Sequence, residues 1–252
     1  MRSVAGLVVV ALAVALATPA AAQSRRYPAA PVDKDAETAA RSKLWAATLT
    51  PQRHPYQELV HAAQVALGQR TPDQTREAIA RLDQAIQLLP RDPEAYRMRG
   101  DIYLEQKDWA RCAADFAAAD AGTRRVDEPP RALAELRKKL GLCMAHAGKL
   151  AEAEKTLAET VASGAGGGDV WMRLGEVRIA MGKLDEAIAA LRSAPDGSDH
   201  PAQGLIHFLL AMAYDRGRRP ADARVEASEG VRLDKQLTVL KAPPVPLVGA
   251  GE

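Results

Sequence analysis

The sequence predicts an all-α fold, a right-handed α-solenoid of about five helix–turn–helix units, and three observations support it. First, 51 of the 252 residues are alanine, the best helix former. Second, Phe, Trp and Tyr together number only 10, so a β-sandwich or barrel is not expected. Third, helical segments of similar length alternate with breaks from about residue 55 onward. The breaks fall at Thr71–Asp73, Pro90–Pro93, Asp127–Pro130, Gly148–Lys149, Gly164–Asp169, Gly182–Lys183, Pro195–Pro201 and Gly217–Pro220.

The first 22 residues have the three-part layout of a secretory signal peptide. Arg2 supplies a positive charge, an apolar run covers residues 4–16, and small residues follow at 20–22. We therefore expect cleavage between Ala22 and Gln23 and a periplasmic or secreted bacterial protein. The alternative is an uncleaved N-terminal anchor, since the uncharged stretch is about long enough to span a bilayer. No second long apolar run follows, so no integral membrane segment is expected in the mature chain.

The rest of the chain divides into three parts. Residues 23–54 form a leader or linker with one short helical candidate at Asp33–Ala47. Residues 55–239 form the helical repeat domain. Residues 240–252 contain three prolines, which predicts an extended or disordered tail.

The charge balance limits the partners of the protein. Lys and Arg number 34 and Asp and Glu number 32, which gives a formal net charge of +2. A chain so balanced has no overall field for holding nucleic acid or an anionic membrane surface, and we expect it to bind neither.

The repeat domain shows self-similarity at a period near 34 residues. Residues 93–119 align with residues 168–194, and 134–160 share the same offsets. Small residues recur at Gly100, Gly141 and Gly175, where two helices of one unit would approach closely. The units start near residues 59, 93, 134, 168 and 204, with an insertion expected at Ala121–Pro130. This pattern resembles the tetratricopeptide repeat family, whose 34-residue unit is a helix–turn–helix.

The resemblance implies that the first helices line a concave groove that binds a peptide or a partner helix. The family's groove positions correspond here to Arg97, Met98, Asp101, Leu104, Glu105, Lys138, Lys139, Leu142, Met172, Arg173, Glu176, Ile179, Phe208 and Met212. This set predicts a groove that is charged in the middle and apolar toward its C-terminal end. The Lys and Asn residues of the family's carboxylate-binding clamp are missing from the ninth positions, so chaperone docking is not implied.

The two cysteines lie on helices that should be antiparallel neighbours. Cys112 is near the start of a second helix, and Cys143 is near the end of the next unit's first helix. An exported compartment permits oxidation, so a disulfide is one interpretation. Two buried thiols that pack as small hydrophobic groups are the other.

No motif in the sequence predicts catalysis. The five histidines lack the HExxH and CxxCH spacings of zinc proteases and haem attachment, and residues 164–168 (GAGGG) lack the Lys-Ser/Thr of a phosphate loop. We therefore expect no enzyme activity, no cofactor and no metal. The main hypothesis is a non-catalytic exported scaffold that binds another protein in envelope assembly, secretion or cell-wall processes. The alternative is a self-associating structural subunit that forms a homo-oligomer.

Overall fold

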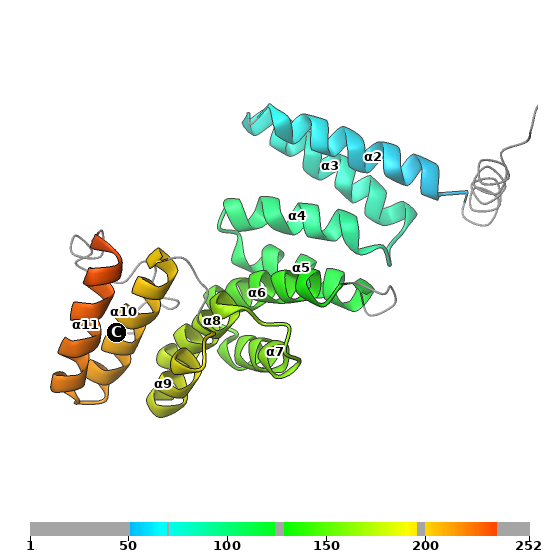
Figure 1. Ribbon diagram of the computed structural model, residues 1–252. Coiled ribbons are helices and arrows are strands. Elements are labelled where there is room, and N and C mark those ends of the chain that lie inside the picture. The colour runs from blue at the N-terminus through cyan, green and yellow to red at the C-terminus, as the bar shows by residue number, and fades with distance from the viewer. Residues whose placement is uncertain (1–50, 70, 124–128, 196–199, 236–252) are drawn as a thin grey trace, which may run out of the picture. The chain divides into compact units, whose positions relative to one another are not determined.

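The computed structural model describes residues 51–69, 71–123, 129–195 and 200–235, and within these ranges it contains ten α-helices and no strand (Figure 1). The chain divides into two compact units, and the described residues all belong to the second, Thr50–Glu252. The predicted signal peptide, the Asp33–Ala47 helix and the tail at 240–252 lie outside the described residues. The helices are α2 (Arg53–Gly68), α3 (Pro72–Leu88), α4 (Pro93–Glu105), α5 (Trp109–Thr123), α6 (Pro130–His146), α7 (Leu150–Ala162), α8 (Gly168–Ala180), α9 (Leu184–Arg192), α10 (His200–Arg216) and α11 (Pro220–Leu233).

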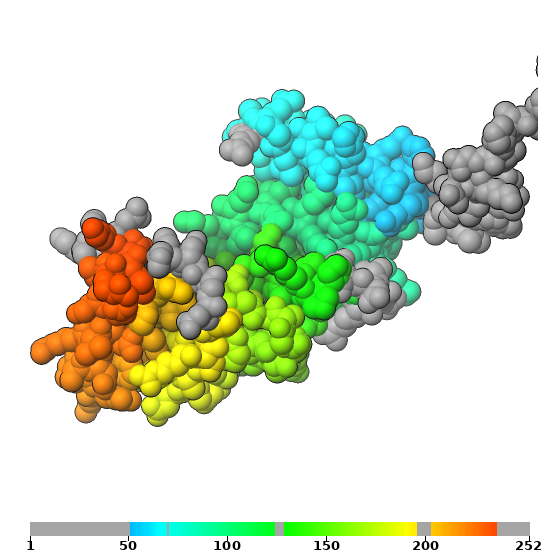
Figure 2. Space-filling view, in the orientation of Figure 1, coloured from blue at the N-terminus to red at the C-terminus, as the bar shows by residue number. Residues whose placement is uncertain are grey.

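The helices form five pairs, α2–α3, α4–α5, α6–α7, α8–α9 and α10–α11. Each helix packs against the next one in the chain, within a pair and from one pair to the next (Figures 1 and 2). This arrangement confirms the predicted all-α solenoid of five helix–turn–helix units. Contact between the second helix of one pair and the first helix of the next is called a junction below. The predicted insertion is partly helical, since α5 continues to Thr123 before α6 begins at Pro130.

Helix starts follow from local sequence. Proline occupies the first helical position of α3, α4, α6 and α11, where the missing N–H would have no intrahelical partner. Thr71 caps α3 by accepting a hydrogen bond at Oγ1 from the N–H of Gln74 at 3.2 Å. Asp92 caps α4 by accepting one at Oδ1 from the N–H of Glu94 at 3.1 Å. The caps lie at two of the breaks that the sequence predicts, Thr71 within the first pair and Asp92 between the first and second pairs.

One turn geometry joins the two helices within four of the pairs. Gly148 and Gly182 have φ of 79° and 74°, and Lys107 and Arg218 stand at the equivalent turns with φ of 57°. Each turn is closed by a bond of the kind that Lys183 N–H donates to the carbonyl of Arg178, 2.9 Å long. A non-glycine residue can therefore occupy this turn, although the left-handed backbone conformation is unfavourable for it.

The predicted small residues do bring the helices of a pair together. A Cβ atom placed on Gly100 would lie 3.0 Å from the ring of Phe116, and one on Gly175 would lie 2.5 Å from Cγ of Leu191. Gly141 has the same relation to Leu157, at 2.7 Å. A larger residue at these positions would push the two helices apart.

Among the residues that the structure describes, the core is divided into four clusters of buried side chains. The first draws on α2, α3 and α4, and the second on α4, α5 and α6. The third draws on α6 to α9 and the fourth on α8 to α11. Each cluster therefore holds neighbouring pairs together, and no cluster reaches the whole array.

Candidate functional site

Charged side chains connect the first helices of successive pairs. The Lys139 ammonium on α6 donates to Oδ1 of Asp101 on α4 at 2.5 Å. Lys138, the neighbouring residue on α6, pairs with Asp169 on α8. These contacts form a row across α4, α6 and α8, which we call the first-helix face and define by Asp101, Lys138, Lys139, Asp169 and Arg173.

The first-helix face is accessible to a partner even though its charges are paired. The side chains of Asp101 and Lys139 are 45% and 37% exposed. Arg173 is 30% exposed and donates to Oε2 of Glu176 at 2.6 Å. Lys138 also pairs with Glu135, one turn away on the same helix, at 2.7 Å. The face therefore offers alternating positive and negative groups rather than a field of one sign.

Three residues predicted for the groove are instead buried. Met172 and Ile179 are 7% and 4% exposed and belong to the cluster formed with α9, α10 and α11. Glu176 is 8% exposed. Because α10 packs against α8 as well as α9, this part of α8 is covered. The prediction that Met172 and Ile179 anchor a ligand is therefore corrected, since their side chains anchor the last two pairs.

The remaining predicted groove residues occupy intermediate environments. Met98, Leu104, Leu142 and Met212 are partly buried and pack against the core clusters. Arg97 and Phe208 are also partly buried, and Glu105 is exposed. The predicted apolar C-terminal end of the groove is thus reduced to Phe208 and Met212.

Burial and charge perturb two ionisable groups next to this face. Burial raises the pKa of the Glu176 carboxyl, and the nearby Arg173 opposes that change only in part. His146 stacks on Trp109 with ring centroids 4.2 Å apart. Burial lowers the pKa of His146, and the charges of Arg173 and Lys107 lower it further.

The sequence analysis missed an arginine at three of the junctions. Arg99 on α4 pairs across the junction with Asp83 on α3, and it also forms a two-fold hydrogen bond, both distances 2.7 Å, with Asp115 on α5 of its own pair. The other two pairs are Arg137 on α6 with Asp120 on α5, at 2.7 Å, and Arg178 on α8 with Glu154 on α7, at 3.1 Å. In the sequence, only Arg99 departs visibly from the repeat pattern, because it occupies the seventh position of its unit, where later units have leucine. These arginines stabilise the stacking of pairs.

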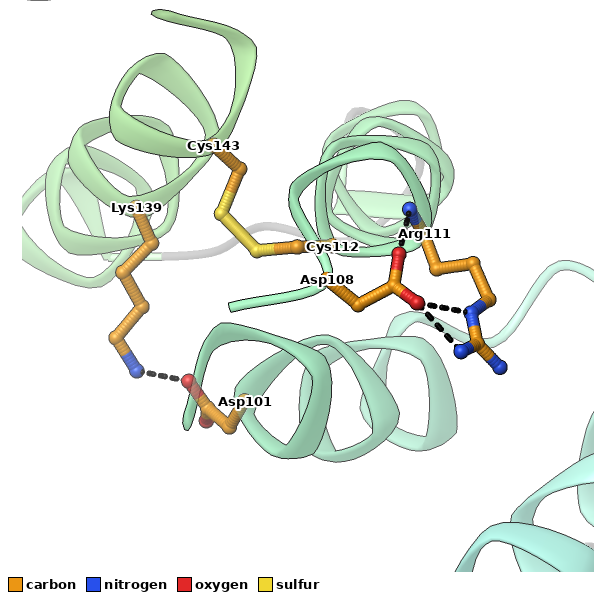
Figure 3. The surroundings of a disulfide bond; sticks show 6 residues. All are labelled: Asp101, Asp108, Arg111, Cys112, Lys139 and Cys143. Carbon is orange, nitrogen blue, oxygen red and sulfur yellow. Dashed lines mark hydrogen bonds and ion pairs between the residues drawn. A yellow bond between two sulfur atoms is a disulfide. The ribbon is translucent and has the colours of Figure 1, made fainter. Parts of the chain in front are cut away.

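Cys112 and Cys143 form a disulfide in the structure, with Cα atoms 5.8 Å apart. Cys112 lies on α5 and Cys143 on α6, so the bond crosses the junction between the second and third pairs (Figure 3). Figure 3 also shows the Asp101–Lys139 pair beside it. Part of the first-helix face therefore lies next to a covalent link.

A hollow of about 370 Å³ lies between α9, α10 and α11. Leu191, Ile206 and Leu210 line it together with His207 and Glu226. The imidazole Nδ1 of His207 is 2.7 Å from Oε2 of Glu226, so these polar groups bind each other. Within the described part of the chain, no cluster of three or more His, Cys, Asp or Glu side chains could hold a metal ion. None of the helices described is both long enough and apolar enough to span a bilayer.

Two family models, both described as tetratricopeptide repeat, match the chain. One covers residues 144–198, and the other covers residues 62–127 and 172–234. No curated protein gives a significant sequence match.

Several solved structures have a similar fold. YrrB, described as a tetratricopeptide repeat protein with an unusual peptide-binding site, is 15% identical with a TM-score of 0.58, over 72% of this chain and 87% of that one. MamA from Desulfovibrio magneticus is 16% identical with a TM-score of 0.61, over 72% of this chain and 96% of that one. Another MamA structure is 17% identical with a TM-score of 0.59, over 76% and 98%.

Proposed function

Because the chain belongs to the tetratricopeptide repeat family, whose fold indicates a protein–protein interaction scaffold, we propose that it is a non-catalytic adaptor that binds a segment of another protein along the first-helix face. The observation that carries the proposal is the row of partly exposed, alternating charges from Asp101 to Lys139 and from Lys138 to Asp169. Leu104 and Leu142, which are partly buried on the same helices, add apolar contact area.

Such a face favours an extended or helical segment that carries charges of both signs. A partner carboxylate would compete with Asp101 for Lys139, and a partner ammonium would compete with Lys138 for Asp169 or Glu135. Opposite charges orient a partner and raise its association rate more than they raise its affinity. We therefore expect binding that weakens with ionic strength.

We place this adaptor outside the cytoplasm, in envelope assembly, secretion or cell-wall processes. The support is the signal-like sequence of residues 1–22, with its apolar run and the small residues at 20–22. N-terminal sequencing of the native protein tests the location. A mature N-terminus at or near Gln23 supports it, and an intact Met1 on membrane-bound protein indicates the uncleaved anchor instead. An intact N-terminus on protein recovered from the cytoplasmic fraction contradicts it.

A charge swap tests the binding face without removing its internal pair. In the double variant Asp101→Lys, Lys139→Glu, the ion pair is kept with its direction inverted, so helicity and melting temperature should change little. The tagged protein is used to capture envelope proteins, and a partner identified by mass spectrometry is purified and titrated against both forms. We expect the swap to weaken binding at least about tenfold.

The matched control is a swap on α3, Glu77→Arg with Arg81→Glu, which inverts an exposed pair on a second helix. It should bind the purified partner as the native chain does. Equal affinity of the native chain and the Asp101/Lys139 swap would remove the first-helix face from the proposal.

A self-associating structural subunit is the second candidate, because the first and last of the described helices each expose a large apolar side chain. Val65 on α2 is 56% exposed and Val225 on α11 is 69% exposed. Contact between such ends would extend the array from one copy to the next. Sedimentation should then show oligomers that the variant Val65→Glu, Val225→Glu abolishes, whereas a concentration-independent monomer contradicts this candidate.

A further inference from the structure

The junction between α5 and α6 differs from the others in how many kinds of contact hold it. Four contacts join α5 to α6. They follow one another along successive turns of α5 and in the reverse order along α6, as expected for antiparallel helices. From one end to the other, they are the Trp109–His146 ring stack, the Cys112–Cys143 disulfide, the Lys139 ammonium 5.8 Å from the Phe116 ring centre, and the Arg137–Asp120 ion pair.

The repeat places equivalent residues at the other junctions, where no covalent bond joins them. Cys112 holds the twentieth position of its unit and Cys143 the tenth position of the next unit. At the other junctions the equivalent positions are occupied by small or aliphatic side chains that are all buried. These are Ala78 with Ile102, Ala153 with Val177, and Ala187 with Ala213.

The disulfide is closed off from solvent. Both cysteines are 0% exposed, and Tyr103, Phe116 and Leu140 belong to the same core cluster. A reagent can therefore reach the sulfur atoms only when α5 and α6 separate. The state of the bond and the opening of the junction are coupled for this reason.

We propose that the Cys112–Cys143 disulfide is a covalent clamp on the α5–α6 junction, which makes the second and third helix pairs open as one cooperative unit. Repeat arrays are stabilised by the units and by the contacts between neighbours. A bond across one junction converts a contact that can break into one that cannot. The array then has a fixed centre, formed by α4 to α7, and flanking pairs that can open separately.

The test is hydrogen exchange, resolved by helix, on the full chain. The variant Cys112→Ala, Cys143→Val gives this junction the residues found at the α7–α8 junction, Ala153 and Val177, which limits the loss of packing. In the oxidised native chain, α5 and α6 should share one opening equilibrium. In the variant, α5 and α6 should have different opening equilibria. The less stable of the two helices should open at least roughly 30-fold more often than it does in the oxidised native chain.

Two results would overturn the clamp. One is a variant in which α5 and α6 still exchange with a common opening equilibrium, since packing alone would then couple them.

The other comes from the native chain and needs no variant. Reduction by a dithiol transfers two electrons and two protons, leaving Cys112 and Cys143 as thiols and the reagent as a disulfide. This reduction should be on the order of 10³-fold slower in the folded chain than in the denatured chain, because it must wait for the junction to open. Equal rates would contradict the proposal.

Discussion

The Glu176 carboxyl on α8 is buried and forms an ion pair with Arg173, one turn away on the same helix. Burial raises its pKa above the usual value of 4.5, so the folded state binds its proton more tightly than the unfolded state does. Stability from this group is therefore present at low pH and is lost as the pH rises through the raised pKa. We expect Glu176→Gln to be more stable than the native chain at pH 7 and to lose this part of the pH dependence.

Denaturant unfolding at several pH values measures that difference. Glu159→Gln, on the exposed side of α7, is the control and should leave the pH profile of the native chain unchanged. If the free energy of unfolding of Glu176→Gln depends on pH as that of the native chain does, the ion pair with Arg173 compensates for burial.

Backbone conformation at the turns gives a second prediction for single residues. Arg218 is exposed and has φ of 57°, where the equivalent turn of the preceding pair has Gly182 with φ of 74°. Arg218→Gly should stabilise the protein by about 0.5–1 kcal/mol, since it relieves a left-handed conformation. Gly182→Arg should cost about 1–2 kcal/mol, although the site has free space. Chemical denaturation measures both, and a sign reversal of either would show that side-chain contacts outweigh backbone strain.

At the scale of helices, we expect the antiparallel register to be the same at each junction, and transplanting the disulfide tests this equivalence. Ala153 and Val177 occupy the positions that Cys112 and Cys143 occupy one junction earlier, and both are buried. Ala153→Cys with Val177→Cys should form a second disulfide, between α7 and α8. Intact mass and thiol titration of the denatured protein detect it, and two additional free thiols under oxidising conditions would contradict the common register.

The sequence predicted the helices well because the signals that define them are local. Proline at helix starts, glycine at Gly148 and Gly182, and small residues at a 34-residue spacing each depend on a few neighbouring positions. The binding face was predicted less well. Whether Met172 or Ile179 is exposed depends on how closely α10 approaches α8, and a repeat pattern does not contain that distance. The arginines at 137 and 178 gave no signal, because their carboxylate partners stand in other units.

At the scale of the whole chain, the divided core predicts graded stability. The terminal pairs α2–α3 and α10–α11 each have a described neighbour on one side only, whereas the central pairs have one on both. Amides of the terminal pairs should therefore exchange fastest, and those of the central pairs α4–α5, α6–α7 and α8–α9 more slowly. Native-state hydrogen exchange with increasing denaturant measures the order. A single opening equilibrium shared by the ten described helices would contradict the view that neighbouring pairs stabilise one another in series.

The disulfide also sets how the folded chain would respond to tension applied at its ends. Cys112 and Cys143 are 31 residues apart in sequence but have Cα atoms only 5.8 Å apart. Under load, the force passes through the sulfur atoms and leaves the intervening segment slack. That segment would otherwise add about 100 Å of contour length on full extension. A pulling measurement should thus record a shorter total extension for the oxidised protein than for the reduced one, by about that amount.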